Sequence, residues 1–218
     1  MVRLDSKELI NDLYKDLEKN SKNLPLATKP EDIIPGEGPV DAKILFIGEA
    51  PGAQEVVERR PFVGRSGKFF RKTLLEEAKI PDSEVYISNI VKVRPPENRD
   101  PTPEEIQAFK PFLDREIEII KPKLIVTLGR FSMAKFLASV KISQVHGRLH
   151  KVEWPVGEGE NQTSIFILPM YHPAAGLRNG KMRASFVEDF KKIPKIIKWI
   201  EEQKEVEGFK ESVVEHLF

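Results

Sequence analysis

Three side chains of different chemistry stand at, or just past, the ends of short apolar runs: Glu49, Asn89 and His172. A carboxylate can position water or stabilise a cation, and an amide offers both a hydrogen-bond donor and an acceptor. An imidazole can donate a hydrogen bond or a proton near neutral pH. These groups would suit electrostatic or acid–base catalysis on a bound ligand if the fold brings them to one place.

Four apolar runs are too short for helices and rich in β-branched residues, which predicts strands buried on both faces. They are Lys43–Gly48, Val85–Val91, Leu124–Leu128 and Ser164–Leu168. Helical spacing of apolar residues occurs around and between them, in Ser6–Leu17, Ser66–Ala78, Pro103–Ile120, Arg130–Leu137 and Ala184–Lys204. This alternation predicts an α/β fold in three α/β/α layers, with a central four-stranded parallel sheet. Because ligands bind beyond the carboxyl ends of strands in such sheets, the three side chains are expected at one rim.

Two of the predicted helices carry recognisable starts. Ser6 is the expected N-cap of the first helix. Thr102 is the expected N-cap of the helix at 103–120, in which Pro103 takes the first position and Glu104 and Glu105 lie in the first turn.

Composition narrows the classes of protein that fit. The chain has 218 residues and no cysteine, which excludes disulfides and thiolate metal sites. Lys and Arg number 35 against 34 Asp and Glu, so any contact with DNA depends on a local arrangement of charge. The charged fraction of 32% resembles that of hyperthermophilic proteins. No apolar run reaches about 18 residues, and we expect a cytoplasmic, intracellular protein without a membrane span or signal peptide.

Three segments carry a family resemblance: Gly48–Gly67, Ser88–Pro103 and His172–Asn179. In sequence, spacing and order they resemble the signature blocks of family-four uracil-DNA glycosylases, and the similarity covers roughly Pro35 to Lys192. The resemblance implies an enzyme of base excision repair that flips uracil out of DNA and hydrolyses its N-glycosidic bond. It implies a monofunctional hydrolase that leaves an abasic site, because no lysine takes a block position suited to Schiff-base chemistry.

The resemblance implies two catalytic residues, Glu49 and His172. His172 would donate a hydrogen bond to uracil O2 as negative charge develops on the leaving base. Glu49 would position water or stabilise the sugar cation. Taken alone, His172 could also cap a helix or anchor a loop, and Glu49 could be a turn residue. Ala50 stands where other glycosylase families place an aspartate that activates water, so the general base stays open.

Five residues are expected in the uracil pocket: Ala50, Gly52, Glu55, Phe62 and Asn89. The resemblance implies that Asn89 pairs with O4 and N3–H of uracil, that Phe62 stacks beneath the flipped base, and that Glu55 excludes the methyl group of thymine. Each has a plainer alternative. Asn89 could end a strand and start a turn, Phe62 could be a core aromatic, and Glu55 could be a surface acid.

A glycine-rich turn formed by Gly64, Ser66 and Gly67 precedes a predicted helix and exposes amide groups suited to a DNA phosphate. Arg65 and Lys68 would add positive charge. An ordinary helix cap is the alternative.

The block at 172–179 is expected to enter the minor groove. Leu177 is the predicted wedge that fills the gap left by the flipped base, because Gly176 stands where many members carry a larger residue. Arg178 would contact DNA beside it. Arg94 and Arg99, between the second strand and the next helix, could serve DNA or a nucleotide alike.

Members of this family typically hold an iron–sulfur cluster with four cysteines. The matching positions here are Ser21, Leu24, Val93 and Phe109, none of which offers a thiolate to iron. We therefore expect no cofactor and no metal, and a small hydrophobic cluster of Val93 and Phe109 in its place.

One domain is expected over residues 1–205, followed by a tail at 206–218. The tail ends in Glu211–Phe218, ESVVEHLF, which resembles a sliding-clamp-binding peptide with Val214 as its aliphatic residue. The alternative is the last turn of an amphipathic helix packed on the body. Uracil-containing DNA is the expected partner, and a monomer the expected state.

Three other functions remain compatible with the residues. The chain could be a glycosylase for another deaminated base, such as hypoxanthine. It could be a non-catalytic protein that binds uracil or abasic DNA. It could also be an α/β protein for small nucleotides, which would lack salt-dependent affinity for DNA.

Overall fold

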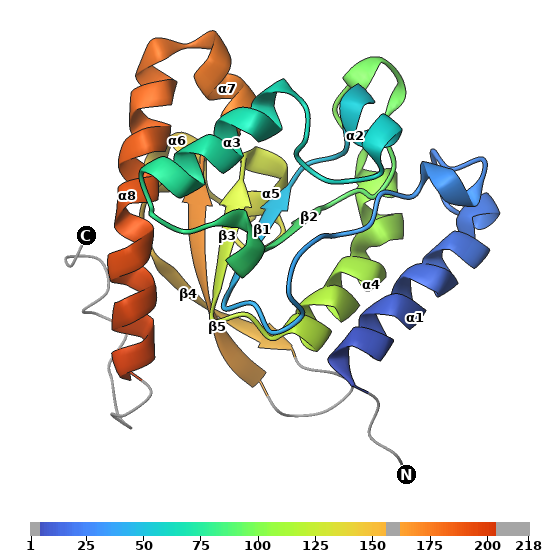
Figure 1. The fold of residues 1–218 in the computed structure, drawn as a ribbon, viewed down its shortest axis with the longest axis horizontal. Helices are drawn as coiled ribbons and strands as arrows, with labels where there is room; N and C mark the ends of the chain where they lie inside the picture. Colours follow the sequence, from blue (N-terminus) through green and yellow to red (C-terminus); the bar gives the residue numbers. More distant parts are fainter. Residues whose placement is uncertain (1–4, 156–161, 204–218) are drawn as a thin grey trace.

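A five-stranded sheet forms the centre of the computed structural model, which describes residues 5–155 and 162–203 (Figure 1). Its order is β2–β1–β3–β5–β4. The strands are β1 (Ile44–Gly48), β2 (Tyr86–Asn89), β3 (Leu124–Leu128), β4 (His150–Pro155) and β5 (Gln162–Met170). Four of them are parallel and correspond to the four predicted runs, whereas β4 pairs antiparallel with β5. The predicted α/β class is confirmed, and the predicted four-stranded sheet is wrong by this one strand.

The additional strand β4 lies at the edge of the sheet, and its sequence explains why the pattern missed it. Charged residues alternate with apolar ones, so that Lys151 and Glu153 are exposed while Val152 and Trp154 are only partly buried. An edge strand that is half solvated lacks the continuous apolar run of the inner strands.

The described residues form eight α-helices around the sheet. They are α1 (Ser6–Lys19), α2 (Ala53–Glu58), α3 (Arg65–Glu76), α4 (Pro103–Ile120), α5 (Arg130–Ala134), α6 (Ile142–Val145), α7 (Pro173–Arg178) and α8 (Gly180–Gln203). Helices α3, α7 and α8 lie on one side of the sheet, and α1 and α4 on the other (Figure 1). Short 3-10 turns lie in the connections, at Ser21–Asn23, Pro30–Asp32, Asp82–Glu84 and Pro96–Asn98. The three predicted layers are therefore present.

The two faces of the sheet pack into two apolar clusters. Phe46 of β1 faces α3 and α8, where it contacts the rings of Phe70 and Phe190 with centroids 5.0 and 6.0 Å away. Its neighbours Leu45 and Ile47 face α4 in the second cluster. A strand whose successive side chains alternate between two buried faces needs a continuous apolar run, which is the pattern that predicted it.

The helix starts were partly predicted. Thr102 caps α4 as expected, with its side chain accepting a hydrogen bond from the Glu105 N–H at 3.3 Å. The N-cap of α1 is Asp5 rather than Ser6, and its backbone N–H donates to the Glu8 carboxylate at 3.2 Å. Aspartate and serine cap about equally well, and the helix begins one residue earlier than an N-cap at Ser6 would place it.

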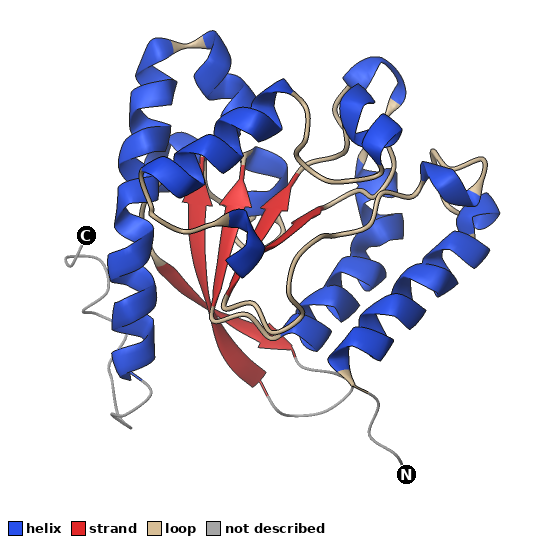
Figure 2. Cartoon of the chain, in the orientation of Figure 1, coloured by secondary structure: helices blue, strands red, loops and turns tan. Residues whose placement is uncertain are grey.

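The parallel strands all end at one edge of the sheet, which Figure 2 shows by its arrowheads. The segments that follow them, with α2, α3 and α7, surround this edge. Among the described residues no helix is long and apolar enough to cross a membrane. The predicted tail at 206–218 lies outside the described residues.

Candidate active site

The carboxyl edge of the sheet holds a cavity of about 570 Å³ that brings together Glu49, Asn89 and His172. Eight more predicted site residues line it: Ala50, Gly52, Glu55, Phe62, Arg65, Ser66, Leu177 and Arg178. Lys68 lies next door, lining a shallower cavity of about 430 Å³ together with Gln54, Gly64 and Arg65. The expectation that Glu49, Asn89 and His172 share one rim is confirmed.

His172 lies at the N-cap of α7, and this position defines its tautomer. Its Nδ1 accepts a hydrogen bond from the backbone N–H of Ala174 at 3.2 Å, and Pro173 occupies the first helical position. A ring nitrogen that accepts carries no proton, so the proton of the neutral ring lies on Nε2. Burial, assisted by the positive charge of Arg178, lowers the pKa of His172 to about 4. The residue is thus both a helix cap, which was one alternative, and a neutral hydrogen-bond donor on the cavity wall.

Asn89 brings a buried amide to the cavity. Its Oδ1 is buried and has no hydrogen-bond partner among the described residues, although buried polar atoms are normally paired. Gly48 makes room for it, because a Cβ there would lie 2.5 Å from Asn89 Oδ1 and 2.4 Å from Phe62 Cζ. Asn89 lines the cavity, and an amide whose oxygen has no partner among the described residues is suited to a ligand that supplies an N–H group.

Phe62 forms the wall beside Asn89. Its ring packs 5.1 Å from Phe70 and 6.1 Å from the His172 ring, measured between centroids. It therefore belongs to the core and lines the cavity at the same time. Its backbone has φ +55°, a left-handed conformation that is unusual for a bulky residue.

Glu55 is buried, so the alternative of a surface acid is wrong. Its Oε1 accepts hydrogen bonds from the backbone N–H groups of Val63 at 3.0 Å and Gly64 at 2.8 Å. These residues directly follow Phe62, and the carboxylate therefore holds the turn that presents the ring. The spacing of the block gave no signal of this contact, because it depends on the chain returning to α2.

Glu49 is the partly buried acid of the cavity. Burial raises its pKa, the nearby charge of Asp100 raises it further, and Arg130 opposes the increase. Arg130 also forms an ion pair with Asp100. Glu49 and Asp100 therefore bring two carboxylates to the cavity lining, and Arg130 offsets part of their negative charge.

Sequence reasoning missed the part of the rim that comes from the β2–α4 connection. Pro95, Asn98 and Asp100 line the cavity beside Arg99, for which only a general contact had been considered. Arg94 Nε donates to Asn98 Oδ1 at 2.8 Å. The available signal was their place in the second signature block, just past a strand.

The family model described as the uracil DNA glycosylase superfamily matches residues 35–194 of the chain. The chain belongs to the uracil DNA glycosylase superfamily.

Relatives within this superfamily cover most of the chain. The type-4 uracil-DNA glycosylase of Sulfurisphaera tokodaii is 46% identical over 165 residues, which is 73% of this chain and 72% of that protein. The type-4 enzyme of Saccharolobus solfataricus is 38% identical over 187 residues, 84% of each chain. That of Thermotoga maritima is 37% identical over 195 residues, 88% of this chain and 97% of that protein.

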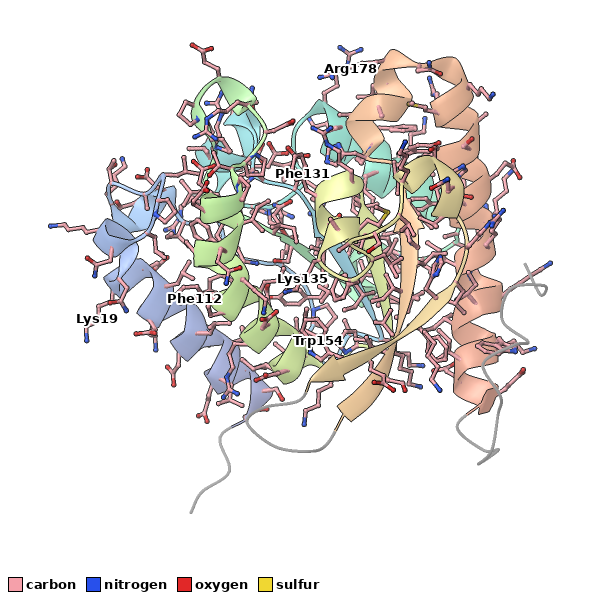
Figure 3. The ribbon with its side chains drawn as sticks, turned by 180° about the vertical axis from the view of Figure 1, so that it is seen from behind. Lys19, Phe112, Phe131, Lys135, Trp154 and Arg178 are labelled. Atoms are coloured by element: carbon pink, nitrogen blue, oxygen red, sulfur yellow. The ribbon has the colours of Figure 1, made fainter. Side chains whose placement is uncertain are left out.

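This superfamily member presents exposed cations at the mouth of its cavity. Arg65 occupies the first position of α3 after Gly64 and is exposed, as is Lys68. Across the mouth, Arg178 at the end of α7 points away from the body (Figure 3). Its neighbour Leu177 is partly exposed.

Gly176 faces inwards on α7. A Cβ there would lie 3.1 Å from Phe69 and 3.4 Å from the Arg183 backbone. This glycine allows α7 to pack against α3 and α8, and a larger residue there would meet the body. Leu177 is the residue of this pair that reaches the cavity.

The four positions that the family resemblance assigned to cluster ligands offer no thiolate to iron. Ser21, Val93 and Phe109 are buried, and Val93 and Phe109 belong to the apolar cluster between the sheet and α4. Leu24 packs against the same cluster. In the part of the chain that the structure describes, no group of three His, Asp or Glu side chains could hold a metal ion either.

Proposed function

We propose that this protein is a monofunctional uracil-DNA glycosylase that flips uracil out of DNA, hydrolyses its N-glycosidic bond and leaves an abasic site for base excision repair. The observation that carries the proposal is the amide of Asn89, whose buried Oδ1 has no partner among the described residues and which lines the same cavity as the neutral imidazole of His172. Relatives that are 35–46% identical and carry the name type-4 uracil-DNA glycosylase support it.

Recognition of the base rests on Asn89. Its Oδ1 would accept a hydrogen bond from uracil N3–H, and its amide nitrogen would donate to O4. Cytosine offers an acceptor at N3 and a donor at C4, so both contacts would be reversed. Phe62 would stack on the flipped base, and Glu55, with Ala50 and Gly52, would limit the space for the methyl group of thymine.

Bond cleavage rests on His172 and Glu49. As the C1′–N1 bond breaks, its electron pair passes to uracil, and the Nε2–H of His172 stabilises the charge at O2. Glu49 in its ionised form stabilises the sugar cation and positions the water that adds to C1′. The proton of that water leaves to Glu49 or to solvent. Ala50 supplies no carboxylate, so a water activated by an aspartate at this position is not available.

DNA binding depends on the exposed groups around the cavity. The N-terminus of α3, with Arg65, Ser66 and Lys68, would bind a phosphate. Leu177 would enter the duplex as the base leaves it, and Arg178 would contact the backbone. The protein would therefore show affinity that falls with salt although its net charge is +1.

The deciding assay uses a labelled oligonucleotide with a single uracil, followed by heating in alkali to cut abasic sites. The expected result is cleavage at the uracil by the protein and strongly reduced cleavage by His172→Ala. Tight binding without cleavage would instead support a non-catalytic uracil-binding protein. Cleavage at hypoxanthine in preference to uracil would support the other glycosylase function.

The protein is proposed to work without an iron–sulfur cluster or other cofactor. Apolar packing around Val93 and Phe109, with Leu24 against the same cluster, supports this. Iron analysis of the purified protein, and activity after treatment with a chelator, test the proposal. Stoichiometric iron that activity requires would contradict it.

We further propose that the protein is a cytoplasmic monomer. Its segment Glu211–Phe218 would bind a sliding clamp. The tail lies outside the described residues, and its support is its sequence alone. Removal of residues 211–218 should abolish binding to a clamp and leave excision from short oligonucleotides unchanged. Equal clamp binding by both forms would contradict it.

A further inference from the structure

Phe62 adopts a backbone conformation that the rest of the protein must hold in place. Its φ of +55° brings Cβ of a non-glycine residue close to its own backbone, which is unfavourable for an aromatic side chain. Such conformations persist where surrounding contacts determine them, and they are frequent at functional sites. The contacts around Phe62 therefore decide where its ring lies.

Arg71 supplies the contacts at the turn itself. From α3, its Nε donates to the carbonyl oxygen of Phe62 at 3.0 Å and its Nη2 to that of Pro61 at 2.9 Å. The helix can come this close because it carries Gly67, where a Cβ would lie 2.1 Å from the Phe62 carbonyl carbon. Arg71 thus binds both carbonyl groups that precede and follow the strained backbone.

The guanidinium is itself oriented by acids from two other segments. Arg71 forms ion pairs with Asp82 and with Glu37, whose Oε2 lies 3.5 Å from Nη2. Glu37 is bonded through its backbone to Ile87 of β2, with N–H to O distances of 2.9 and 2.8 Å in the two directions. Asn89 lies two residues further along that strand. Arg71 therefore connects the turn that carries Phe62 to the strand that carries Asn89.

We infer that Arg71 is a positioning residue for uracil excision, which holds the Phe62 ring in place beside Asn89 and His172. The inference rests on the proposed role of Phe62 as the platform for the base. Arg71 lies behind the turn, outside the set of described residues that line the cavity, and its side chain is 16% exposed. It therefore acts through Phe62 and does not touch the base.

Only arginine suits this position. The planar guanidinium binds two carbonyl oxygens and two carboxylates with separate N–H groups, whereas a lysine ammonium is a compact group on a flexible stem. Glu55 holds the residues after Phe62 from another side, so the turn should stay folded when Arg71 is replaced. The expected consequence is a displaced ring in a folded protein.

A double-variant cycle tests the inference. Single-turnover rates and KM on a uracil oligonucleotide are measured for Arg71→Lys, Phe62→Leu and the double variant, with melting temperatures recorded for each. Arg71→Lys should slow the single-turnover step roughly 10-fold, since small displacements of a positioning group are costly. In the Phe62→Leu background the same change should slow it less than about twofold. The matched control is Lys72→Gln on the same helix, whose side chain is 68% exposed and should have no effect.

The outcomes separate the inference from the proposed function. If Phe62→Leu keeps the full rate, the platform role fails. If Phe62→Leu is slow while Arg71→Lys keeps the full rate, or slows the reaction equally in both backgrounds, the inference alone fails. Should Arg71→Lys fold poorly, Asp82→Asn provides the same cycle with a smaller expected loss of two- to threefold, because Arg71 keeps both carbonyl bonds.

Discussion

The Nδ1 atom of His172 accepts a hydrogen bond from the backbone N–H of Ala174, at 3.2 Å. This contact joins two properties that the sequence presented as alternatives, the capping of a helix and a role in the site. Capping requires Nδ1 without a proton, and the neutral ring then points its only N–H group, Nε2–H, elsewhere. The helix start thereby prepares His172 for its proposed role as hydrogen-bond donor to the leaving uracil.

The pH dependence of excision should reflect a neutral His172. Burial lowers its pKa to about 4, below the ordinary value of 6.5. The neutral form is therefore present above pH 5, and the rate should not change through pH 6.5. Below pH 6.5 the imidazole takes up a proton in the unfolded chain but not yet in the folded one. The free energy of unfolding should therefore decrease as pH falls from 6.5 towards 4. Single-turnover rates and an NMR titration of the ring test this, and an imidazole that titrates near 6.5 would contradict it.

Replacement of Asn89 by Ala should separate activity from stability. Loss of the base contacts should reduce kcat/KM for uracil about 100-fold, the equivalent of two good hydrogen bonds. The free energy of unfolding should stay constant or rise by about 1 kcal/mol, because the variant removes a buried acceptor that has no partner among the described residues. Denaturant unfolding and excision assays measure the two effects. A less stable variant would indicate that the amide is paired in the free enzyme.

Gly48 should tolerate no side chain. In Gly48→Ala the new methyl group would lie 2.4 Å from Phe62 and 2.5 Å from Asn89, so both must shift. We expect the free energy of unfolding to fall by about 1–3 kcal/mol. We also expect kcat/KM to fall under conditions in which the variant is still folded. The control is Gly180→Ala, where no described residue outside the adjoining backbone lies within 4 Å of the added group and little change is expected. Normal activity of Gly48→Ala would mean that the wall is adaptable.

The sequence predicted those parts of the molecule whose pattern is local. The strand β3 and the helix α4 were predicted to the residue, because one is buried on both faces and the other carries Thr102 and Pro103 at its start. The rim was predicted because parallel strands end at one edge. The missed strand β4 pairs at the sheet border and has no continuous apolar run.

The contacts that hold the site were beyond local patterns. Glu55 binds residues eight and nine positions later, and Arg71 binds carbonyl groups that only the folded turn exposes. Side chains that act on the backbone leave no periodic signal, so their roles follow from the structure alone. The buried polar network next to Asn89, formed by Ser88, Lys92 and Glu116, likewise left no signal in the local pattern.

That network is a buried ion pair between Lys92, which follows β2, and Glu116 of α4, with Nζ and Oε2 2.6 Å apart and both side chains at most 1% exposed. Ser88, directly before Asn89, donates to the same carboxylate oxygen at 2.8 Å. Lys92→Met alone should cost about 3–5 kcal/mol because it leaves an unpaired buried charge, whereas Lys92→Met with Glu116→Leu should recover most of it. Denaturant unfolding measures both. Lys198→Met, at a pair that is 78% and 61% exposed, is the control with an expected change below about 1 kcal/mol.

Phe109 tests the proposal that apolar packing stabilises this region in place of a metal cluster. Its side chain is fully buried next to Val93 in the cluster between the sheet and α4. Phe109→Ala should cost about 3–5 kcal/mol through lost burial and a cavity. Because Phe109 lies outside the set of residues that line the active-site cavity, excision at temperatures well below the transition should keep its KM. Thermal unfolding with and without chelator completes the test. A chelator that lowers the melting temperature of the unaltered protein would show that packing alone does not stabilise the region around Val93 and Phe109.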